Sequence, residues 1–303
     1  MSRTPAQQRI GKTTPSKAPR RSLGPFAPRN ISGTLFTGYL PLLIATLLMV
    51  LPLIWMVVSS FKQIGEIINV PIHWLPHTEY TGNYKQAATA IPLLRMFANT
   101  ALVTAIGASV KLVLAIFTAY ALVFVRFPFK RVIFMLILVA LMVPPQVSVL
   151  SNFIFISGLG GMNTYWGIIL PGLGTAFGTF LLRQYFLGLP PAILESAAID
   201  GASHWRRLWQ IVVPISAPAI ITVGLITIVG EWNDYLWPLV ITDNPKFMTL
   251  SVGLTLLQDT EQGATAWGVL MAATVLVILP VLIIFVLLQR YVIAGLSQGA
   301  TKG

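Results

Sequence analysis

The sequence has 303 residues, of which 55% are hydrophobic and only 10% are charged, with a formal net charge of +11. Soluble domains contain about 25% charged residues, so this composition argues against a water-soluble globule, and the high apolar content excludes a disordered chain. The absence of cysteine and the presence of only three histidines argue against disulfide frameworks and against zinc or thiolate metal sites. The class that remains is a polytopic membrane protein.

Six segments are long and apolar enough to cross a membrane, because a crossing helix needs about 20 mostly apolar residues. They lie near residues 36–60, 96–124, 132–150, 165–187, 215–240 and 265–288. The uncharged stretch 132–182 is too long for one helix, and it divides at Pro144-Pro145 and at the Gly- and Asn-containing stretch 157–164. The sequence thus predicts an all-α fold, with a six-span transmembrane domain over residues 35–290.

The basic residues predict the direction of the spans, since Lys and Arg are enriched in cytoplasmic segments. Residues 1–34 contain seven of them and no acid, which predicts a basic, disordered cytoplasmic tail. Alternation of the spans then places 15 of the 20 Lys and Arg residues inside, four outside, and Lys111 within the membrane. We expect a multi-pass protein of the cytoplasmic membrane with both termini inside, residues 291–303 forming a second cytoplasmic tail. The basic tail either serves this topology alone or also binds membrane lipid through anionic headgroups.

The cytoplasmic loop over residues 188–214 has the sequence pattern of two short helices that meet at a glycine. Pro191 suits the first turn of a helix, and Gly201 permits the left-handed conformation that ends one. Ser203 is a candidate N-cap for a second helix, which Pro214 separates from the fifth span. The small residues of the first helix leave a surface that another protein can approach closely.

This loop resembles the "EAA" loop of permease subunits in binding-protein-dependent ABC importers. The shared pattern is Glu-x-Ala, three residues, Gly, nine residues, then Ile-x-x-Pro. In that family the loop is the coupling helix that docks into a groove of the ATPase subunit. The resemblance therefore implies an ATPase-coupling role for Glu195, Ser196, Ala197, Ala198, Asp200, Gly201, Ile211 and Pro214. Ser196 and Val213 replace the Ala and Leu usual in the family.

Three further segments resemble the smaller, six-span permease of carbohydrate importers of the maltose and glycerol-phosphate class. They are residues 126–130 after the second span, 231–239 in the fifth span, and 289–296 at the end of the sixth. Lys111 together with residues 182–186 and 235–239 leans toward the sn-glycerol 3-phosphate type. The resemblance implies the ABC importer permease fold and no enzymatic activity in this chain.

The resemblance also implies a set of partners. These are a second, homologous permease in a heterodimer, two P-loop ATPase subunits that hold ATP and Mg, and an extracytoplasmic solute-binding protein. The chain itself shows no phosphate-binding loop, so we expect it to bind no cofactor, and we expect no nucleic-acid partner.

Polar residues within the spans mark a possible substrate path, because ionisable side chains in a membrane usually face an interior or a water-filled cavity. Lys111 lies in the second span, and Glu231 and Asp234 lie three residues apart in the fifth, a spacing that predicts one shared helix face. Sugars and polyols are bound by such polar groups together with aromatic faces, and Lys111 could favour a phosphate. The other candidates in the fifth span are Trp232, Asn233, Tyr235 and Trp237.

Other interpretations of these residues stay open. Lys111 could pair with a carboxylate across the bundle or extend to the interface, and Trp237 could belong to an aromatic belt. The two carboxylates could form a general acid/base pair, although no nucleophile or metal cluster accompanies them, and we expect no catalytic residue. An ion-coupled secondary transporter using Glu231, Asp234 and Lys111 is the main alternative, although no inverted repeat is evident. A membrane scaffold or sensor is a second one.

Overall fold

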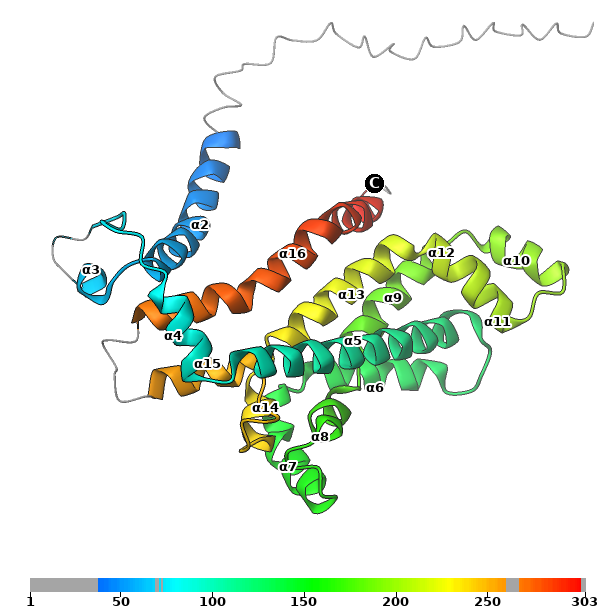
Figure 1. Ribbon diagram of the computed structural model, residues 1–303. Coiled ribbons are helices and arrows are strands. Elements are labelled where there is room, and N and C mark those ends of the chain that lie inside the picture. The colour runs from blue at the N-terminus through cyan, green and yellow to red at the C-terminus, as the bar shows by residue number, and fades with distance from the viewer. Residues whose placement is uncertain (1–37, 69–70, 72, 260–266, 301–303) are drawn as a thin grey trace, which may run out of the picture. The chain divides into compact units, whose positions relative to one another are not determined.

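The computed structural model describes residues 38–68, 71, 73–259 and 267–300, and every regular element in this part of the chain is a helix (Figure 1). Contacts divide the chain into two units, Met1–Pro52 and Leu53–Gly303. The described residues of the first unit are Gly38, Tyr39 and the first part of helix α2 (Leu40–Ser60). The predicted tail over residues 1–34 lies outside the described residues.

Three helices are each long and apolar enough to cross a membrane: α2, α5 (Leu93–Phe124) and α16 (Trp267–Ala300), the last over Trp267–Tyr291. Three pairs of helices are also long and apolar enough when each pair is taken together, although each bends sharply between its two members. The count is therefore three spans among the described residues, or six when each bent pair is one span. The latter count and the all-helical fold agree with the sequence-based expectation.

The third and fourth predicted spans are both broken helices. Instead of one helix over 132–150, α6 (Lys130–Met142) ends before Pro144-Pro145, and the chain turns by 92° into η2 (Pro145–Ser148) and α7 (Val149–Gly158). The end of α6 has a local cause, because proline lacks the N–H that would continue the helix. The segment 165–187 consists of α8 (Tyr165–Ile169), η3 (Leu170–Gly172) and α9 (Ala176–Leu187), with a bend of 47°.

The fifth predicted span is interrupted within residues 233–235. Helix α13 (Ala217–Trp232) ends there and the short α14 (Leu236–Ile241) follows. The ring of Pro238 would clash with the carbonyl of residue 234 in a continuous helix, which accounts for the break. The helix that contains the sixth span continues beyond the end of that span at Tyr291, since α16 is helical to Ala300. Residues 291–300, expected as a tail, are thus part of a helix.

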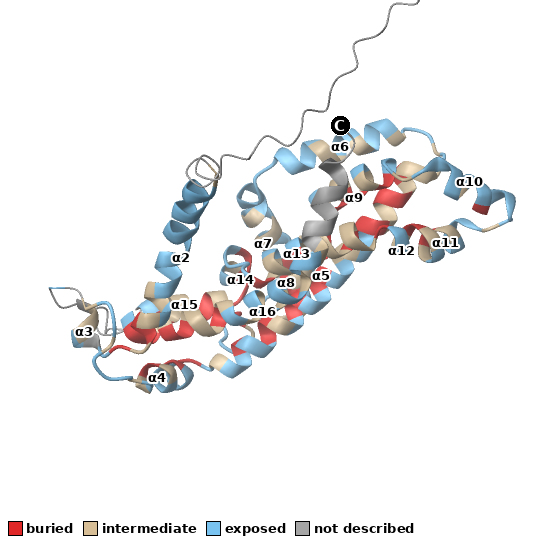
Figure 2. Cartoon of the chain, turned by 90° about the horizontal axis from the view of Figure 1, so that it is seen from above, coloured by how far each residue is buried: buried red, intermediate tan, exposed pale blue. Residues whose placement is uncertain are grey.

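Helix α5 is shared by three clusters of buried hydrophobic side chains, as the buried residues along it in Figure 2 show. The first cluster joins it to α4 (Gly82–Ala90), α13, α15 (Leu250–Asp259) and α16. The second joins it to α9, α13 and the π-helix η4 (Leu208–Val212), and the third to α7, α8 and α14. The small, fully buried Ala115 and Ala119 let neighbouring helices approach α5 closely.

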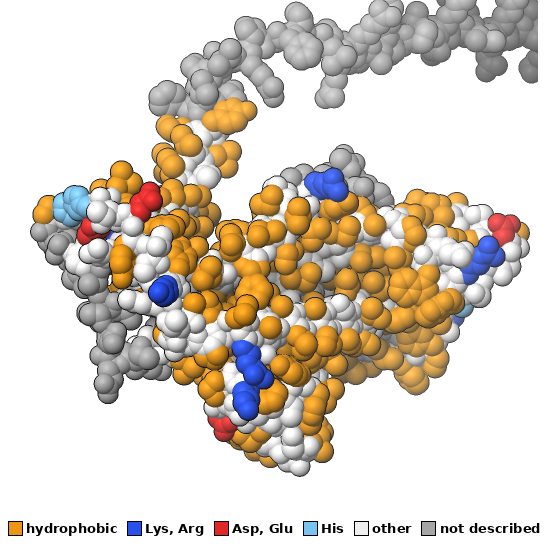
Figure 3. Space-filling model, viewed as in Figure 1, with side chains coloured by type: hydrophobic (Ala, Val, Ile, Leu, Met, Phe, Trp, Pro, Cys, Tyr) orange, Lys and Arg blue, Asp and Glu red, His pale blue; other side chains and the backbone are white. Residues whose placement is uncertain are grey.

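Many large hydrophobic side chains remain exposed, and α6 has no buried residue at all. The face drawn in Figure 3 is mostly covered by hydrophobic side chains, while its charged side chains form small, separate groups. Such a surface is matched by lipid or by other membrane subunits rather than by water.

The connection between α2 and α5 contains α3 (Ile64–Ile68), α4 and a buried cation. The Lys62 ammonium donates a hydrogen bond to the carbonyl of His73 and lies 4.2 Å from the centre of the Trp55 ring. Burial lowers the pKa of Lys62 from its ordinary value, an effect that the negative charge of Glu66 partly opposes. The sequence predicts only an external loop for this segment, and its two helices were not predicted.

Candidate functional site

The loop 188–214 begins with helix α10 (Pro191–Ile199), which has Pro191 in its first turn. The helix ends in a Schellman motif, in which the Ala202 N–H donates to the Ala197 carbonyl at 3.0 Å and the Gly201 N–H to the Ala198 carbonyl at 3.1 Å. Gly201 adopts φ +74°, the left-handed conformation that this motif requires. The two-helix arrangement with a turn at glycine is therefore confirmed.

The second half of the loop is built into the helical core. The Ser203 hydroxyl caps α11 (His204–Arg207) by accepting a hydrogen bond from the Arg206 N–H at 3.3 Å. The chain continues through η4 and α12 (Val213–Ile215), and it bends by 81° before α13. Leu208 and Val212 of η4 are buried against α5, α9 and α13. A displacement of the loop would therefore act directly on three core helices.

The predicted coupling residues fall into two groups in space. Glu195, Ser196, Ala198, Asp200 and Gly201 form an exposed surface on α10 and at its end. In contrast, Ala197 is buried, and Ile211 and Pro214 lie at the far end of the loop, next to α13.

Two exposed apolar residues at the tip of the loop were not singled out from the sequence. Ile199 is 86% exposed and Trp205 is 65% exposed. A large apolar side chain beside a turn glycine is the signal that could have found them. They give this exposed surface a hydrophobic part that a protein partner could cover.

A pocket of about 720 Å³ lies behind α10, between this helix and the ends of α5 and α9. Glu195 and Arg207 line it, and the Tyr120 hydroxyl lies 3.1 Å from Nδ1 of His204 at its wall. The pocket separates part of α10 from the helical core, whereas η4 packs directly against α5, α9 and α13.

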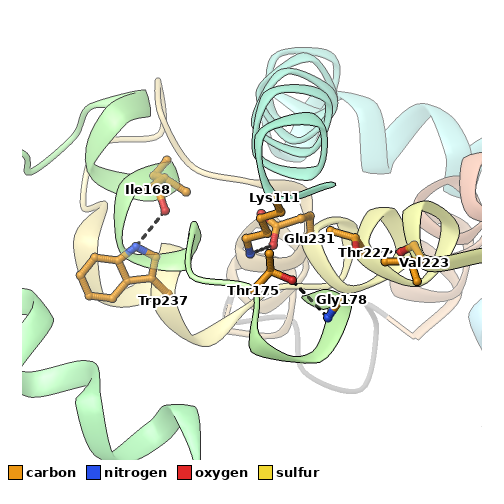
Figure 4. Close-up of polar contacts among 8 residues, drawn as sticks. All are labelled: Lys111, Ile168, Thr175, Gly178, Val223, Thr227, Glu231 and Trp237. Atoms are coloured by element: carbon orange, nitrogen blue, oxygen red, sulfur yellow. Dashed lines mark hydrogen bonds and ion pairs between the residues drawn. The ribbon is translucent and has the colours of Figure 1, made fainter. Parts of the chain in front are cut away.

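The second candidate site is built around an ion pair between two helices. The Lys111 ammonium of α5 points to the Glu231 carboxylate of α13 and pairs with it (Figure 4). The two side chains are 16% and 15% exposed. Of the interpretations of Lys111 that the sequence left open, pairing with a carboxylate across the bundle is the one observed.

Gly107, one turn before Lys111, provides the space for this ion pair. A Cβ atom at position 107 would lie 2.7 Å from Oε2 of Glu231. A larger residue there would push the carboxylate away from its present position.

The ion pair forms one wall of a pocket of about 500 Å³ between α5, α7, η3 and the break that follows α13. The structure brings together here Lys111, Glu231, Asp234 and Trp237, which are four of the candidates for the substrate path. The pocket also contains polar residues that sequence reasoning missed: Gln146, Ser148 and Asn152. Their polarity within a long uncharged stretch, directly after two prolines, was the available signal.

The other residues predicted for the path do not line this pocket. Trp232 is buried against α16, where its Nε1 donates to the Val277 carbonyl at 3.0 Å. Asn233 and Tyr235 lie exposed in the break between α13 and α14. Because α13 ends at Trp232, the argument that Glu231 and Asp234 share one helix face is wrong, although both reach the pocket.

Trp237 is held rigidly rather than placed in an interfacial belt. It is only 9% exposed, and its Nε1 donates to the Gly167 carbonyl at 3.2 Å and to the Ile168 carbonyl at 3.1 Å, the second of which is drawn in Figure 4. Asp234 lies in the break between α13 and α14, where it lines the pocket and is exposed. The lining thus carries one cation, two carboxylates, amide and hydroxyl groups, and an indole.

Comparisons with known proteins agree over most of the chain. Residues 111–298 match the family described as "Binding-protein-dependent transport system inner membrane component". The sn-glycerol-3-phosphate transport system permease protein UgpE of Rhizobium meliloti (strain 1021) is 34% identical over 268 residues, covering 86% of this chain and 95% of that protein. The protein of the same name from Yersinia pestis bv. Antiqua (strain Antiqua) is 32% identical over 265 residues, or 85% and 94% of the two chains.

Two solved structures have a similar fold. A chain of a bacterial ABC transporter involved in the import of the acidic polysaccharide alginate superposes with a TM-score of 0.77 at 24% identity, covering 88% of this chain and 99% of that chain. A chain of the bacterial alginate ABC transporter in complex with an alginate pentasaccharide-bound periplasmic protein gives 0.60 at 14% identity, over 86% and 94%.

Proposed function

The chain belongs to the family of inner membrane components of binding-protein-dependent transport systems, and from this premise we propose that it forms half of the solute path of an ATP-driven importer. It is a multi-pass transport subunit of the inner membrane, a permease for a sugar or a glycerol phosphate. The observation that carries the mechanism is the exposed helix–glycine–helix loop 188–214, whose second half is packed into the core.

In the proposed mechanism, the exposed surface of α10, with Ile199 and Trp205, docks on an ATPase subunit. Two such ATPases bind and hydrolyse ATP with Mg, and their closure moves the loops of two permeases. Because Leu208 and Val212 contact α5, α9 and α13, this movement shifts the bundle between inward-open and outward-open states. Each ligand then acts through its different affinity for the two states.

The proposed assembly contains a second, homologous permease and an extracytoplasmic solute-binding protein. One of the solved structures with a similar fold is a transporter in complex with a periplasmic protein. Loop 188–214 and both termini are proposed to lie in the cytoplasm, because this orientation leaves most Lys and Arg residues on that side.

The proposed solute is sn-glycerol 3-phosphate or a closely similar glycerol phosphate, after the relatives that carry this name. Lys111 is the cation in the pocket that can pair with a phosphate, and Glu231 neutralises it when no solute is present. The amide and hydroxyl groups of Gln146, Ser148 and Asn152 suit the hydroxyls of a polyol. The family match does not favour an ion-coupled secondary transporter.

ATP-dependent uptake into vesicles that contain the whole importer and its binding protein tests this proposal. We expect uptake of radiolabelled sn-glycerol 3-phosphate, and a loss of at least tenfold for Lys111→Gln. Uptake of an uncharged sugar alone, with full activity in Lys111→Gln, would overturn the solute assignment. Uptake without any ATPase subunit, driven by an ion gradient, would overturn the importer.

A further inference from the structure

A third pocket, of about 440 Å³, lies where the ends of three membrane helices meet, and it shares Val123 and Leu187 with the pocket behind α10. The end of α5, the beginning of α6 and the last turns of α9 form it. Since α9 leads directly into loop 188–214, this pocket lies at the membrane face that carries the loop. Its position is therefore that of the lipid headgroups in one leaflet.

Three cations line the pocket, and no carboxylate is among its lining residues. They are Lys130 and Arg131 at the start of α6 and Arg183 of α9. The positive charges of Lys130 and Arg183 repel each other. Among the described residues, the structure contains one salt bridge, between Lys111 and Glu231. Within that part of the chain, none of the three cations therefore pairs with a carboxylate. Such a cluster is completed by an anion.

The cations are positioned by contacts that leave donors available. The Lys130 ammonium donates to the carbonyls of Val123 and Val125 at 2.9 and 3.2 Å, which uses two of its three N–H groups. The Arg183 guanidinium lies 3.7 Å from the centre of the Phe134 ring, and its buried Nε has no hydrogen-bond partner within the described part of the chain. Arg131 is exposed at the rim.

The rest of the lining is apolar, and it extends along the lipid-exposed helix α6. Its members there are Phe134, Met135 and Leu138, and Leu122 and Leu187 close the other side. Because α6 has no buried residue, an acyl chain can lie along this wall while a phosphate contacts the cations. A free phosphate would use the cations alone and leave the apolar wall empty.

We infer that Lys130, Arg131 and Arg183, with the apolar wall of α6, form a binding site for one anionic phospholipid. The ligand class is a phosphodiester headgroup with acyl chains, of which phosphatidylglycerol is the probe. Bound there, the lipid joins the ends of α5, α6 and α9 at the base of loop 188–214.

Native mass spectrometry of the whole transporter complex, extracted in mild detergent, tests this inference. We expect phosphatidylglycerol to be retained on the parent complex, and Arg183→Gln to weaken its binding about five- to tenfold. Arg290→Gln removes the same charge from an exposed position on α16 and is the matched control, for which we expect parental retention. Leu138→Trp, which fills the apolar wall but keeps all cations, should weaken lipid binding as well.

Three results would overturn the inference. Equal retention of phosphatidylglycerol by the parent and by Arg183→Gln would show that the cations do not hold it. Full competition by inorganic phosphate, with Leu138→Trp unaffected, would identify a free anion as the ligand. Loss of another subunit from the Arg183→Gln complex, with no lipid on the parent, would show that the cations pair with acidic residues of that subunit.

Discussion

At the scale of single residues, the partly buried pair Lys111–Glu231 links α5 to α13 beside the proposed solute path. Removal of either partner leaves the other charge unpaired within the membrane, which costs more than the pair itself contributes. We expect Lys111→Met and Glu231→Gln each to lower the thermal stability of the purified complex. The loss of stability in the double variant should be smaller than the sum of the two single losses. The difference is the coupling energy, which we expect to be about 0.5–3 kcal/mol.

The control for this cycle pairs Lys111→Met with Asp243→Asn, since Asp243 is exposed and lies outside the pocket. These two changes should be additive. Additive losses for Lys111→Met with Glu231→Gln would mean that the two residues do not interact.

Gly107 provides a second residue-scale prediction, because a methyl group there would meet the Glu231 carboxylate. We expect Gly107→Ala to lower the free energy of unfolding by about 1–3 kcal/mol through overpacking. The matched control is Gly230→Ala on α13, where a Cβ atom meets nothing within 4 Å. That change should be neutral or slightly stabilising, and an equal loss for both would contradict the crowding argument.

The identity of the charged groups near the path could be predicted at this scale, but their neighbours could not. Lys111, Glu231 and Asp234 stand out because charge in a span is costly. Which of the two tryptophans faces the pocket depends on where α13 ends, and Trp232 and Trp237 turn out to face different helices. That difference follows from tertiary packing, which the spacing of residues does not encode.

At the scale of elements, the turn at Gly201 sets the relative orientation of α10 and α11. Gly201→Val places a β-branched residue at φ +74°, at a cost of about 1–2 kcal/mol. A Cβ atom there would meet nothing within 4 Å, so the cost arises from the backbone and not from a clash. We expect Gly201→Val to weaken the coupling of ATP hydrolysis to uptake, measured as the ratio of the two rates.

Gly201→Asn is the matched variant, since asparagine tolerates the left-handed conformation better than valine. It should retain most of the coupling. Normal coupling in Gly201→Val, or equal losses in both variants, would contradict the role of this turn.

The loop was predictable because its signals are local: a first-turn proline, a C-terminal glycine and a serine N-cap. The spans were predictable by length and hydropathy, but their internal breaks were only partly so. Pro144-Pro145 marked a boundary, yet the 92° turn into α7 depends on packing against α14. Helices α4 and α15 were missed because both are too short to resemble spans. In addition, α4 is polar and α15 is amphipathic.

At the scale of the whole molecule, the proposed topology places Glu195 in the cytoplasm and Asp243 outside. The chain contains no cysteine, so single cysteines can report accessibility. We expect a membrane-impermeant maleimide to label Asp243→Cys in cells with a permeabilised outer envelope and an intact inner membrane. Glu195→Cys should be labelled only after the inner membrane is opened. The opposite pattern would reverse the orientation.

The proposed contact between the exposed end of α10 and an ATPase subunit can be tested by site-specific crosslinking. Ile199→Cys carries the crosslinker at an exposed position of the loop, and Leu75→Cys, 73% exposed in the segment between α2 and α4, is the control. We predict that the first variant crosslinks to an ATP-hydrolysing subunit and that the second does not. Equal crosslinking from both positions, or none from Ile199→Cys in an intact complex, would contradict the account.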